Sequence, residues 1–481
     1  MTAEVSQQAS LDGQDVDPGG DRRRWATLAV LATGQFMALV DVTIVNVAIP
    51  TMQLKLHASG AALQLVVSGY TIAYAMLLVT GARLGQLRGP RLLFMSGLIT
   101  FTFASLACGF APNVAALIGA RFVQGAGAAA MVPQLISVIQ LRFTGAARVR
   151  ALSVYSATLA SGAVVGQILG GVLVSANLFG GSWRVVFLVN VPVGLVLAGL
   201  VPRFVPADRL PTGQRLDLRG LVVLAGSVLL IVVPLVIGRE EGWPGWAWAS
   251  MAAGLAGVAA FVAVERDVAR RRGNPLLNLR VFEARGIVPA IGALTVGMIG
   301  YGGFLFSLAL HLQRGLGDSP LKAGLTFAPA AAMFGLVSFL WRRLPAAIFA
   351  WLPLAGQAIA GMGYLGLAAA VSAGEWWLVL PLIVVGGGLG LAFAPAMALA
   401  LVKVPSREAA DASGLLTTVI QLAQVVGVAV FGSLFLSLAA HHQVHASSDA
   451  ARVLFCSLAA FTVIGALAAV RLARAVRSPA R

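Results

Sequence analysis

Long apolar runs separated by short polar segments dominate the chain. Each run is about 20 residues long, the length that a helix needs to cross the hydrocarbon core of a bilayer. Continuous runs, rather than ten-residue alternating segments, favour helices over a β-barrel. The pattern therefore predicts an all-α membrane protein. About fourteen spans are expected, at 25–48, 61–82, 92–111, 114–139, 150–176, 184–202, 218–238, 246–264, 286–312, 322–341, 346–372, 376–402, 411–438 and 451–472.

Composition agrees with this interpretation and excludes a soluble globular protein. Hydrophobic residues make up 59% of the 481 residues and charged residues only 11%, whereas about 25% of a soluble domain is charged. The two cysteines, Cys108 and Cys456, lie far apart within apolar runs. We therefore expect neither a disulfide framework nor a thiolate metal site.

The basic residues indicate how the chain is threaded through the membrane. The net charge is +16, but the bases form short clusters between spans rather than one patch, so nucleic acid is not an expected partner. If successive spans cross the membrane in alternate directions, 27 bases lie on one side of the membrane and 6 on the other, with Arg121 inside a span. Because cytoplasmic loops are rich in bases, both termini are predicted to be cytoplasmic, in the cytoplasmic (inner) membrane. The polar, acidic first 21 residues lack the features of a signal peptide.

A weak internal repeat suggests two related halves. Gly166 and Gly171 in the fifth span have counterparts in Gly427 and Gly432 in the thirteenth, each pair after a basic loop. Secondary transporters are often built from repeated halves, although coincidence among 55 glycines is the alternative. We expect a disordered cytoplasmic tail (1–24), an N-terminal six-helix bundle (25–204), an inserted two-helix segment with cytoplasmic linkers (205–284), a C-terminal six-helix bundle (285–473) and a cytoplasmic tail (474–481).

Asp41 is the acid that lies deep within a predicted span, and Arg121 is the base that does so. A carboxylate at the centre of a bilayer costs about 2.5–3.5 kcal/mol on insertion scales, so it is normally paired, protonated or exposed to an aqueous cavity. We expect the two side chains to pair. The pair is interpreted either as a proton-coupling site or as a permanent link between two helices.

Neutral polar side chains within the spans are candidates for a substrate cavity. The alternative for each is an ordinary hydrogen bond between helices. His311 has the further possibility of titrating near neutral pH, although packed histidines are more common. The candidates are Gln35, Asn46, Gln124, His311, Gln313, Gln357, Gln421 and Gln424.

Sequence motifs for enzymatic chemistry are absent. The chain contains no nucleotide-binding G-x-x-x-x-G-K-[ST] loop, no H-E-x-x-H and no G-x-S-x-G. We therefore expect no enzyme activity and no cofactor, with the proton gradient as the energy source. The external cluster of His441, His442 and His445 is expected to be a solvated loop rather than a metal site.

Four segments resemble motifs of one transporter family. Leu39–Pro50 resembles L-D-x-T-[IV]-V-N-V-A-L-P, Ala120–Gly127 resembles R-x-x-Q-G-x-G, Trp183–Gly194 resembles W-R-x-x-F-x-x-N-x-P-x-G, and Gly317–Leu325 resembles G-x-S-P-x-x-A-G-L. With these motifs the chain resembles the fourteen-helix drug:proton antiporter branch of the major facilitator superfamily from Trp25 to about residue 470. The resemblance implies that family's fold, two six-helix bundles plus two inserted helices, and a proton-coupling role for Arg121.

Two motifs depart from the family pattern. The cytoplasmic gating loop has Gln86 where the family has Asp, which puts a charge-relay gate in doubt. The fifth-helix antiporter motif has Gln167 in place of proline, so its glycines survive but its kink is missing. The gating-loop residues are Gly81, Arg83, Gln86, Arg88, Gly89 and Arg91, and the antiporter-motif residues are Gly162, Gly166, Gln167, Gly170 and Gly171.

These observations predict a proton-coupled multidrug or antibiotic exporter of amphipathic or cationic small molecules that works by alternating access. Protons and substrate would compete for one site at Asp41. The expected partners are a small-molecule substrate, protons and membrane lipids, and the protein is expected to be a monomer. The alternatives are a dedicated exporter or facilitator of a single metabolite without proton coupling, and a transporter-like sensor that moves no solute.

Overall fold

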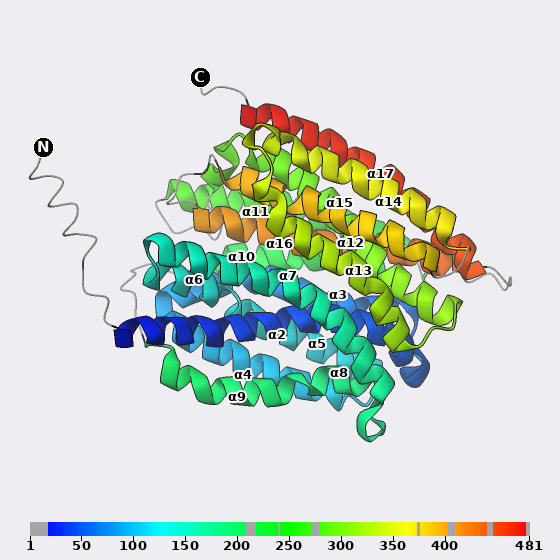
Figure 1. Cartoon of the computed structure of the whole chain (residues 1–481), viewed down its shortest axis with the longest axis horizontal. Helices are drawn as coiled ribbons and strands as arrows, with labels where there is room; N and C mark the ends of the chain where they lie inside the picture. Colours follow the sequence, from blue (N-terminus) through cyan, green and yellow to red (C-terminus); the bar gives the residue numbers. More distant parts are fainter. Residues whose placement is uncertain are drawn as a thin grey trace, which may run out of the picture.

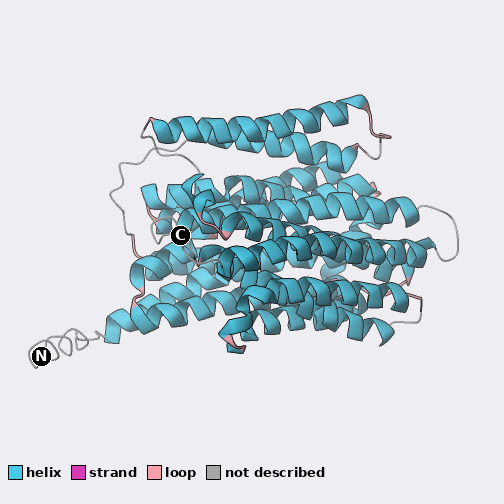
Figure 2. Ribbon diagram, turned by 90° about the horizontal axis from the view of Figure 1, so that it is seen from above, coloured by secondary structure: helices cyan, strands magenta, loops and turns pink. Residues whose placement is uncertain are grey.

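The computed structural model describes residues 18–207, 218–238, 241–271, 279–372, 376–402, 404, 409–439 and 446–477. Within these ranges the chain is helical and contains no strand (Figure 2). The long helices run side by side along a common direction (Figure 1). This arrangement satisfies the backbone polar groups inside each segment, as lipid requires.

The helices follow one another along the chain with short connections. The first group comprises α2 (Pro18–Leu56), α3 (Gly60–Arg88), α4 (Pro90–Gly109), α5 (Val114–Met131), α6 (Pro133–Arg142), α7 (Gly145–Ala176), α8 (Val185–Leu188) and α9 (Asn190–Phe204). Two further helices are α10 (Leu218–Ile237) and α11 (Gly245–Arg270). The last group comprises α12 (Ile287–Leu310), α13 (Pro320–Leu340), α14 (Leu352–Ala370), α15 (Trp376–Leu401), α16 (Ala409–Ala439) and α17 (Ala446–Arg477).

Each predicted span coincides with a helix or with a consecutive pair of helices. Within the described residues, 12 helices are long and apolar enough to cross a membrane. The helices α7 and α10 contribute shorter apolar stretches, Val165–Ala176 and Arg219–Leu235. The chain is therefore a multi-pass membrane protein, while the count of fourteen spans and the domain boundaries stay predictions.

Several boundaries differ from those expected. The first helix already begins at Pro18, inside the segment predicted as a tail. The expected fourth span is divided at Pro133, because proline lacks the N–H that would continue α5. The expected gating loop is also mostly helical, since α3 continues to Arg88 and only Gly89 separates it from α4. Gly89 has a φ of 93°, a conformation that favours glycine.

The helices pack as two groups that meet along two main contacts. Within the first group, α2 packs on α7 and α9, and α5 packs on α3 and α4. Within the last group, α12 packs on α16 and α17, and α14 packs on α15 and α17. The groups meet where α7 contacts α13 and where α3 contacts α16 (Figure 1). The pair α10 and α11 lies beside them, with α10 against α3 and α16.

Glycines set the closest helix contacts in both groups. A Cβ on Gly166 of α7 would overlap the Thr43 side chain on α2, and a Cβ on Gly427 of α16 would overlap the Ile299 carbonyl on α12. Because α2 and α12 are the first helices of their groups, the two glycines occupy corresponding places. This correspondence supports the internal repeat.

Hydrogen bonds join the two groups toward one end of the molecule. The helix α2 begins and α17 finishes at the same end (Figure 1), and we call the opposite end the far end. Toward the far end, Gln313 Nε2 donates to the Val47 carbonyl at 2.9 Å, and Arg314 donates to Gln53 Oε1 at 2.7 Å. The Leu321 amide also donates to the Ser175 hydroxyl, at 2.9 Å. The two groups are thus held together at the far end in this conformation.

We expect Gly427→Ala to lower the thermal stability of the protein in detergent. The added methyl meets the rigid backbone of α12, and overpacking of this kind costs about 1–3 kcal/mol. In the matched variant Gly119→Ala, the methyl meets nothing within 4 Å, so helix propensity should stabilise it by about 0.5–1 kcal/mol. Thermal unfolding of the two purified variants measures the difference. A Gly427→Ala protein at least as stable as wild type would contradict the proposed packing.

Candidate functional site

Asp41 lies on α2 at the centre of a buried polar cluster. Its side chain has no exposed surface and forms an ion pair with Arg121 of α5. Its Oδ1 atom accepts hydrogen bonds from Gln124 Nε2 and from Asn190 Nδ2, both at 2.8 Å. Three donors from two other helices therefore compensate the burial of this carboxylate.

The Arg121 guanidinium is fixed by contacts on several sides. Its Nε donates to the Val66 carbonyl of α3 at 3.0 Å, and it also donates to Gln124 Oε1 at 2.7 Å. The Tyr70 ring centroid lies 4.6 Å from the guanidinium carbon, a distance at which a cation–π interaction is favourable. A planar group with fixed donors suits these simultaneous contacts better than a lysine ammonium would.

Ser105 of α4 completes the cluster. Its hydroxyl oxygen accepts from Gln124 Nε2 and from Asn190 Nδ2, both at 3.0 Å, and its proton is donated to the Phe187 carbonyl at 2.9 Å. The network thus joins α2, α3, α4, α5, α8 and α9. Removing one partner of such a buried charge pair costs about 3–5 kcal/mol, because the other charge is left uncompensated.

Part of this cluster is expected from the sequence. The structure brings Asp41 and Arg121 together, and Gln124 shares the face of Arg121 because the two are three residues apart on one helix. Sequence reasoning assigned no site role to Asn190, although it is the asparagine of the W-R-x-x-F-x-x-N motif. It also missed Ser105, a single serine within an apolar run, for which no sequence signal was available.

The other cavity candidates make separate contacts, and their role in a substrate cavity stays a prediction. Gln35 and Asn46 are buried on α2, and Gln313 is used in the contact between the groups at the far end. His311 lies in the π-helix η4 (His311–Gly315), and its Nδ1 is 2.9 Å from the Ser447 hydroxyl. Hydrogen bonds link Gln357 Nε2 to the Ala293 carbonyl at 3.3 Å, and Gln424 Nε2 to Gln421 Oε1 at 3.3 Å.

Potential metal ligands are not clustered in the part of the chain that the structure describes. No group of three or more His, Cys, Asp or Glu residues there could hold a metal ion. The histidine cluster of the sequence analysis, His441, His442 and His445, lies outside the described residues.

The expected gating residues form a helix contact. Gln134 of α6 donates from Nε2 to the Gly81 carbonyl at 3.0 Å, and a Cβ on Gly85 would overlap the Gln134 side chain. Pro133 starts α6 at this point, which places Gln134 against α3. The bases of the segment, Arg83, Arg88 and Arg91, follow at the end opposite to the far end. The segment therefore fixes the approach of α3 to α5 and α6.

The antiporter-motif residues place α7 between α2 and α13. A Cβ on Gly162 would press on Leu39, and one on Gly170 would press on the Ile44 carbonyl, both of α2. On the other side, Gly171 faces Leu321 of α13. Gln167 is buried in this contact and lines a cavity of about 20 Å³ with aromatic residues of α12 and α13.

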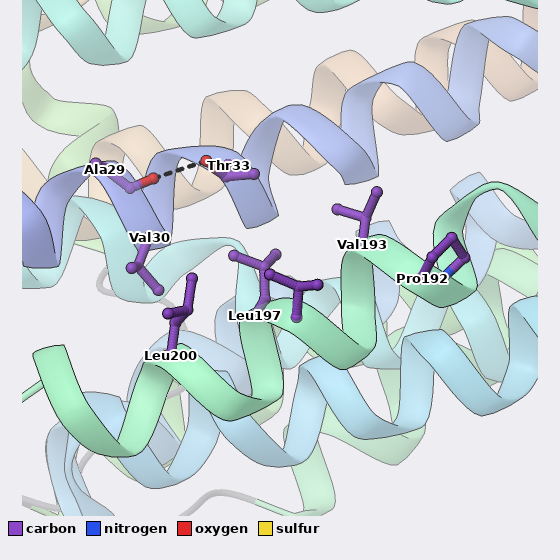
Figure 3. Close-up of a pocket in the computed structure, with 8 residues that line it drawn as sticks. Ala29, Val30, Thr33, Pro192, Val193, Leu197 and Leu200 are labelled. Atoms are coloured by element: carbon purple, nitrogen blue, oxygen red, sulfur yellow. Dashed lines mark hydrogen bonds between the residues drawn. The ribbon is translucent and has the colours of Figure 1, made fainter.

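A larger groove on the outer side of α2 and α9 is a poor candidate site. It has a volume of about 440 Å³ and is lined by apolar side chains and Thr33 (Figure 3). The Thr33 hydroxyl donates to the Ala29 carbonyl at 2.9 Å (Figure 3). The groove therefore presents mainly apolar surface, as expected of a helix pair in contact with lipid chains.

The contacts of Asp41 and the Gln167 cavity involve different helices. All the contacts described for Asp41 come from helices of the first group, whereas the Gln167 cavity lies between α7 and the last group. A substrate in that cavity does not touch the carboxylate in this conformation. The close packing of α2 on α7 connects the two places.

Comparisons with known proteins agree with a transporter fold. The family model described as Major Facilitator Superfamily matches residues 31–428. The probable actinorhodin transporter of Streptomyces coelicolor is 37% identical over 434 residues, which cover 89% of this chain and 75% of that protein. The cephamycin export protein CmcT of Amycolatopsis lactamdurans is 35% identical over 429 residues, which cover 84% and 83%.

A solved structure shows the same fold at low sequence identity. A POT family transporter in complex with 5-aminolevulinic acid superposes with a TM-score of 0.68 at 14% identity, covering 94% of this chain and 97% of that one. Its likeness concerns the fold alone.

We expect Arg121→Leu to destabilise the protein by about 3–5 kcal/mol, because it leaves the Asp41 carboxylate buried without its cation. The double variant Asp41→Asn/Arg121→Leu removes both charges and should be more stable than Arg121→Leu alone. Thermal unfolding of wild type, both single variants and the double variant measures this coupling. Destabilisations that simply add would show that the two charges do not stabilise each other.

Proposed function

Because the chain belongs to the Major Facilitator Superfamily, we propose that it exports antibiotics or related amphipathic or cationic small molecules by alternating access, using the proton gradient. Family membership makes the chain a transporter rather than an enzyme. The substrate class is supported by relatives named for antibiotics, and the direction by the one named as an export protein. The observation that carries proton coupling is the buried pair of Asp41 and Arg121.

We place the protein in the cytoplasmic membrane as a monomer with both termini in the cytoplasm. The bias of bases toward one side of the spans supports this orientation. The far end is then external, and the hydrogen bonds there close the outer side. In the full arrangement, fourteen helices form two six-helix bundles, with α10 and α11 as the inserted pair.

Asp41 is connected to the interface between the two groups through helix packing. On α2, the segment Leu39–Ile44 presents Asp41 to Arg121 and presents Leu39, Thr43 and Ile44 to the glycines of α7. On its other side, α7 contacts α13 through Gly171. A change at Asp41 that shifts α2 is therefore transmitted to α7 and to its contact with α13.

The transport cycle follows from the charge of Asp41. In the inward-open state the carboxylate is ionised and paired, and substrate enters from the cytoplasm. After the change to the outward-open state, a proton from outside neutralises Asp41 and the attraction to Arg121 weakens. The resulting shift of α2 and α7 favours substrate release. Return to the inward state delivers the proton to the cytoplasm.

The complete hydrogen bonding of the Asp41 carboxylate favours a second function, transport without protons. With three donors and no exposed surface, the pair has the features of a permanent link between helices. The chain would then be a facilitator that moves its substrate without protons. The altered gating segment at Gln86 is consistent with such a loss of coupling.

Dye uptake into inverted membrane vesicles distinguishes the two functions. With a fluorescent bis-benzimidazole dye and an acidic vesicle lumen, wild type should accumulate dye, and Asp41→Asn should fall to the level seen without a gradient. The matched control Asp267→Asn removes an exposed acid of α11 that pairs with Arg271 and should transport normally.

Gradient-dependent uptake that survives in Asp41→Asn would exclude Asp41 as the coupling group. Uptake by wild type that exceeds that of vesicles without the protein and is equal with and without the gradient would instead identify a facilitator.

A further inference from the structure

Gln167 is a buried amide whose hydrogen-bonding groups are unused. Its side chain is 2% exposed, and neither Nε2 nor Oε1 has a hydrogen-bond partner among the described residues. Burying an amide without partners is unfavourable, and a buried polar atom in this state calls for a functional explanation. A ligand that supplies one acceptor and one donor would satisfy both atoms.

Four aromatic side chains line the cavity together with aliphatic residues of α12, α13 and α15. Tyr301 and Phe334 stack with ring centroids 6.1 Å apart and ring planes 19° apart, and Phe304 meets Phe327 edge to face at 6.2 Å. Flat aromatic ligands pack favourably against such rings. None of the lining residues carries a charge. The chemistry of the walls thus favours an uncharged, planar ring.

The cavity lies at the contact that must open and close during transport. Gly324 of α13 approaches the Gln167 carbonyl, and Gly171 approaches Leu321. In this conformation the cavity of about 20 Å³ has room for about one water molecule. A ring can enter only when α7 and α13 separate, so occupation of the cavity is linked to the relative position of the two groups.

We propose that Gln167 is a specificity-determining residue that binds substrates through a lactam-type edge, an N–H donor beside a C=O acceptor on a planar aromatic ring. The ligand N–H donates to Gln167 Oε1, and Gln167 Nε2 donates to the ligand carbonyl. The rings of α12 and α13 pack against its faces. This assignment rests on the proposed function as an exporter, whose substrate it specifies.

Phenanthridinone and its N-methyl derivative form a matched pair of probes, because methylation removes the lactam donor and keeps the ring system. Their binding to the full-length protein in nanodiscs is measured by fluorescence anisotropy. Wild type should bind phenanthridinone about tenfold more tightly, the effect of one hydrogen bond worth about 1.4 kcal/mol. In Gln167→Met, which keeps the side-chain length but removes both hydrogen bonds, the two probes should bind equally and no more tightly than the methylated probe binds to wild type.

The control variant Thr80→Val removes another buried polar atom without a partner, on α3 and outside the cavity, and should keep the tenfold preference. Equal binding of the probes to wild type, binding of neither, or a preference that survives in Gln167→Met would each overturn the proposal. Equal binding to wild type would indicate that the amide is satisfied by water alone. The wild-type comparison stands even if Gln167→Met does not fold.

This test is independent of proton coupling, since no gradient is present in nanodiscs. A Gln167-dependent preference together with gradient-independent vesicle uptake would retain the binding site and reject proton-driven export. Gradient-driven vesicle uptake by a protein that binds the two probes equally would retain proton-driven export and reject the binding site at Gln167.

Discussion

The burial of one ion pair within a membrane bundle is the constraint on which the first group of helices depends. Asp41 and Arg121 can remain charged in lipid only if their hydrogen-bonding capacity is met by protein. The groups that meet it come from separate helices: Gln124 from α5, Asn190 from α9 and the Val66 carbonyl from α3. Ser105 of α4 in turn accepts from Gln124 and Asn190. Misplacing any of these helices would leave a charge or an amide unsatisfied, so the pair specifies the arrangement of the group as well as its chemistry.

The opposite side of α2 explains how such a local feature can have wider effects. Glycines on α7 allow the two backbones to approach so closely that no methyl group fits at Gly166 or Gly170. Closely packed helices shift as units rather than deforming gradually. Because α7 is in turn packed against α13, the proposed cycle lets the charge state of Asp41 and the contents of the Gln167 cavity act on the same helix from its two sides. Proton and substrate can then be coupled without touching each other.

The sequence predicts those features that depend on local pattern. Apolar runs locate the helices, and the scarcity of intramembrane charges identifies Asp41 and Arg121 as a pair. Features that depend on three-dimensional packing were not predictable in this way. For example, α3 continues through the expected gating loop as far as Gly89 and is held there by the hydrogen bond from Gln134 to the Gly81 carbonyl. Nothing in the sequence distinguishes Ser105 from other small residues of an apolar helix. Its role follows from the hydrogen bonds that it accepts from Gln124 and Asn190.

The aromatic cavity illustrates the same limit. Tyr301, Phe304, Phe327 and Phe334 belong to two helices whose sequences are largely apolar, and nothing in their spacing indicates that they line a cavity with Gln167. In the sequence, Gln167 is only a departure from a proline. Its significance becomes visible when the structure shows that both amide atoms are buried without partners.

The central claim is that substrate binding and protonation of Asp41 exclude each other through α2 and α7. Thermodynamic linkage then requires that substrate binding releases protons at any pH at which Asp41 is partly protonated in the free protein. The most direct test is the pH change of a weakly buffered solution of the purified protein when the bis-benzimidazole dye binds, measured over a series of starting pH values that includes those at which Asp41 is partly protonated. Wild type should release protons within that series, and Asp41→Asn should release none at equal dye occupancy. Binding without proton release in wild type throughout the series, or equal release in the variant, would contradict the central claim.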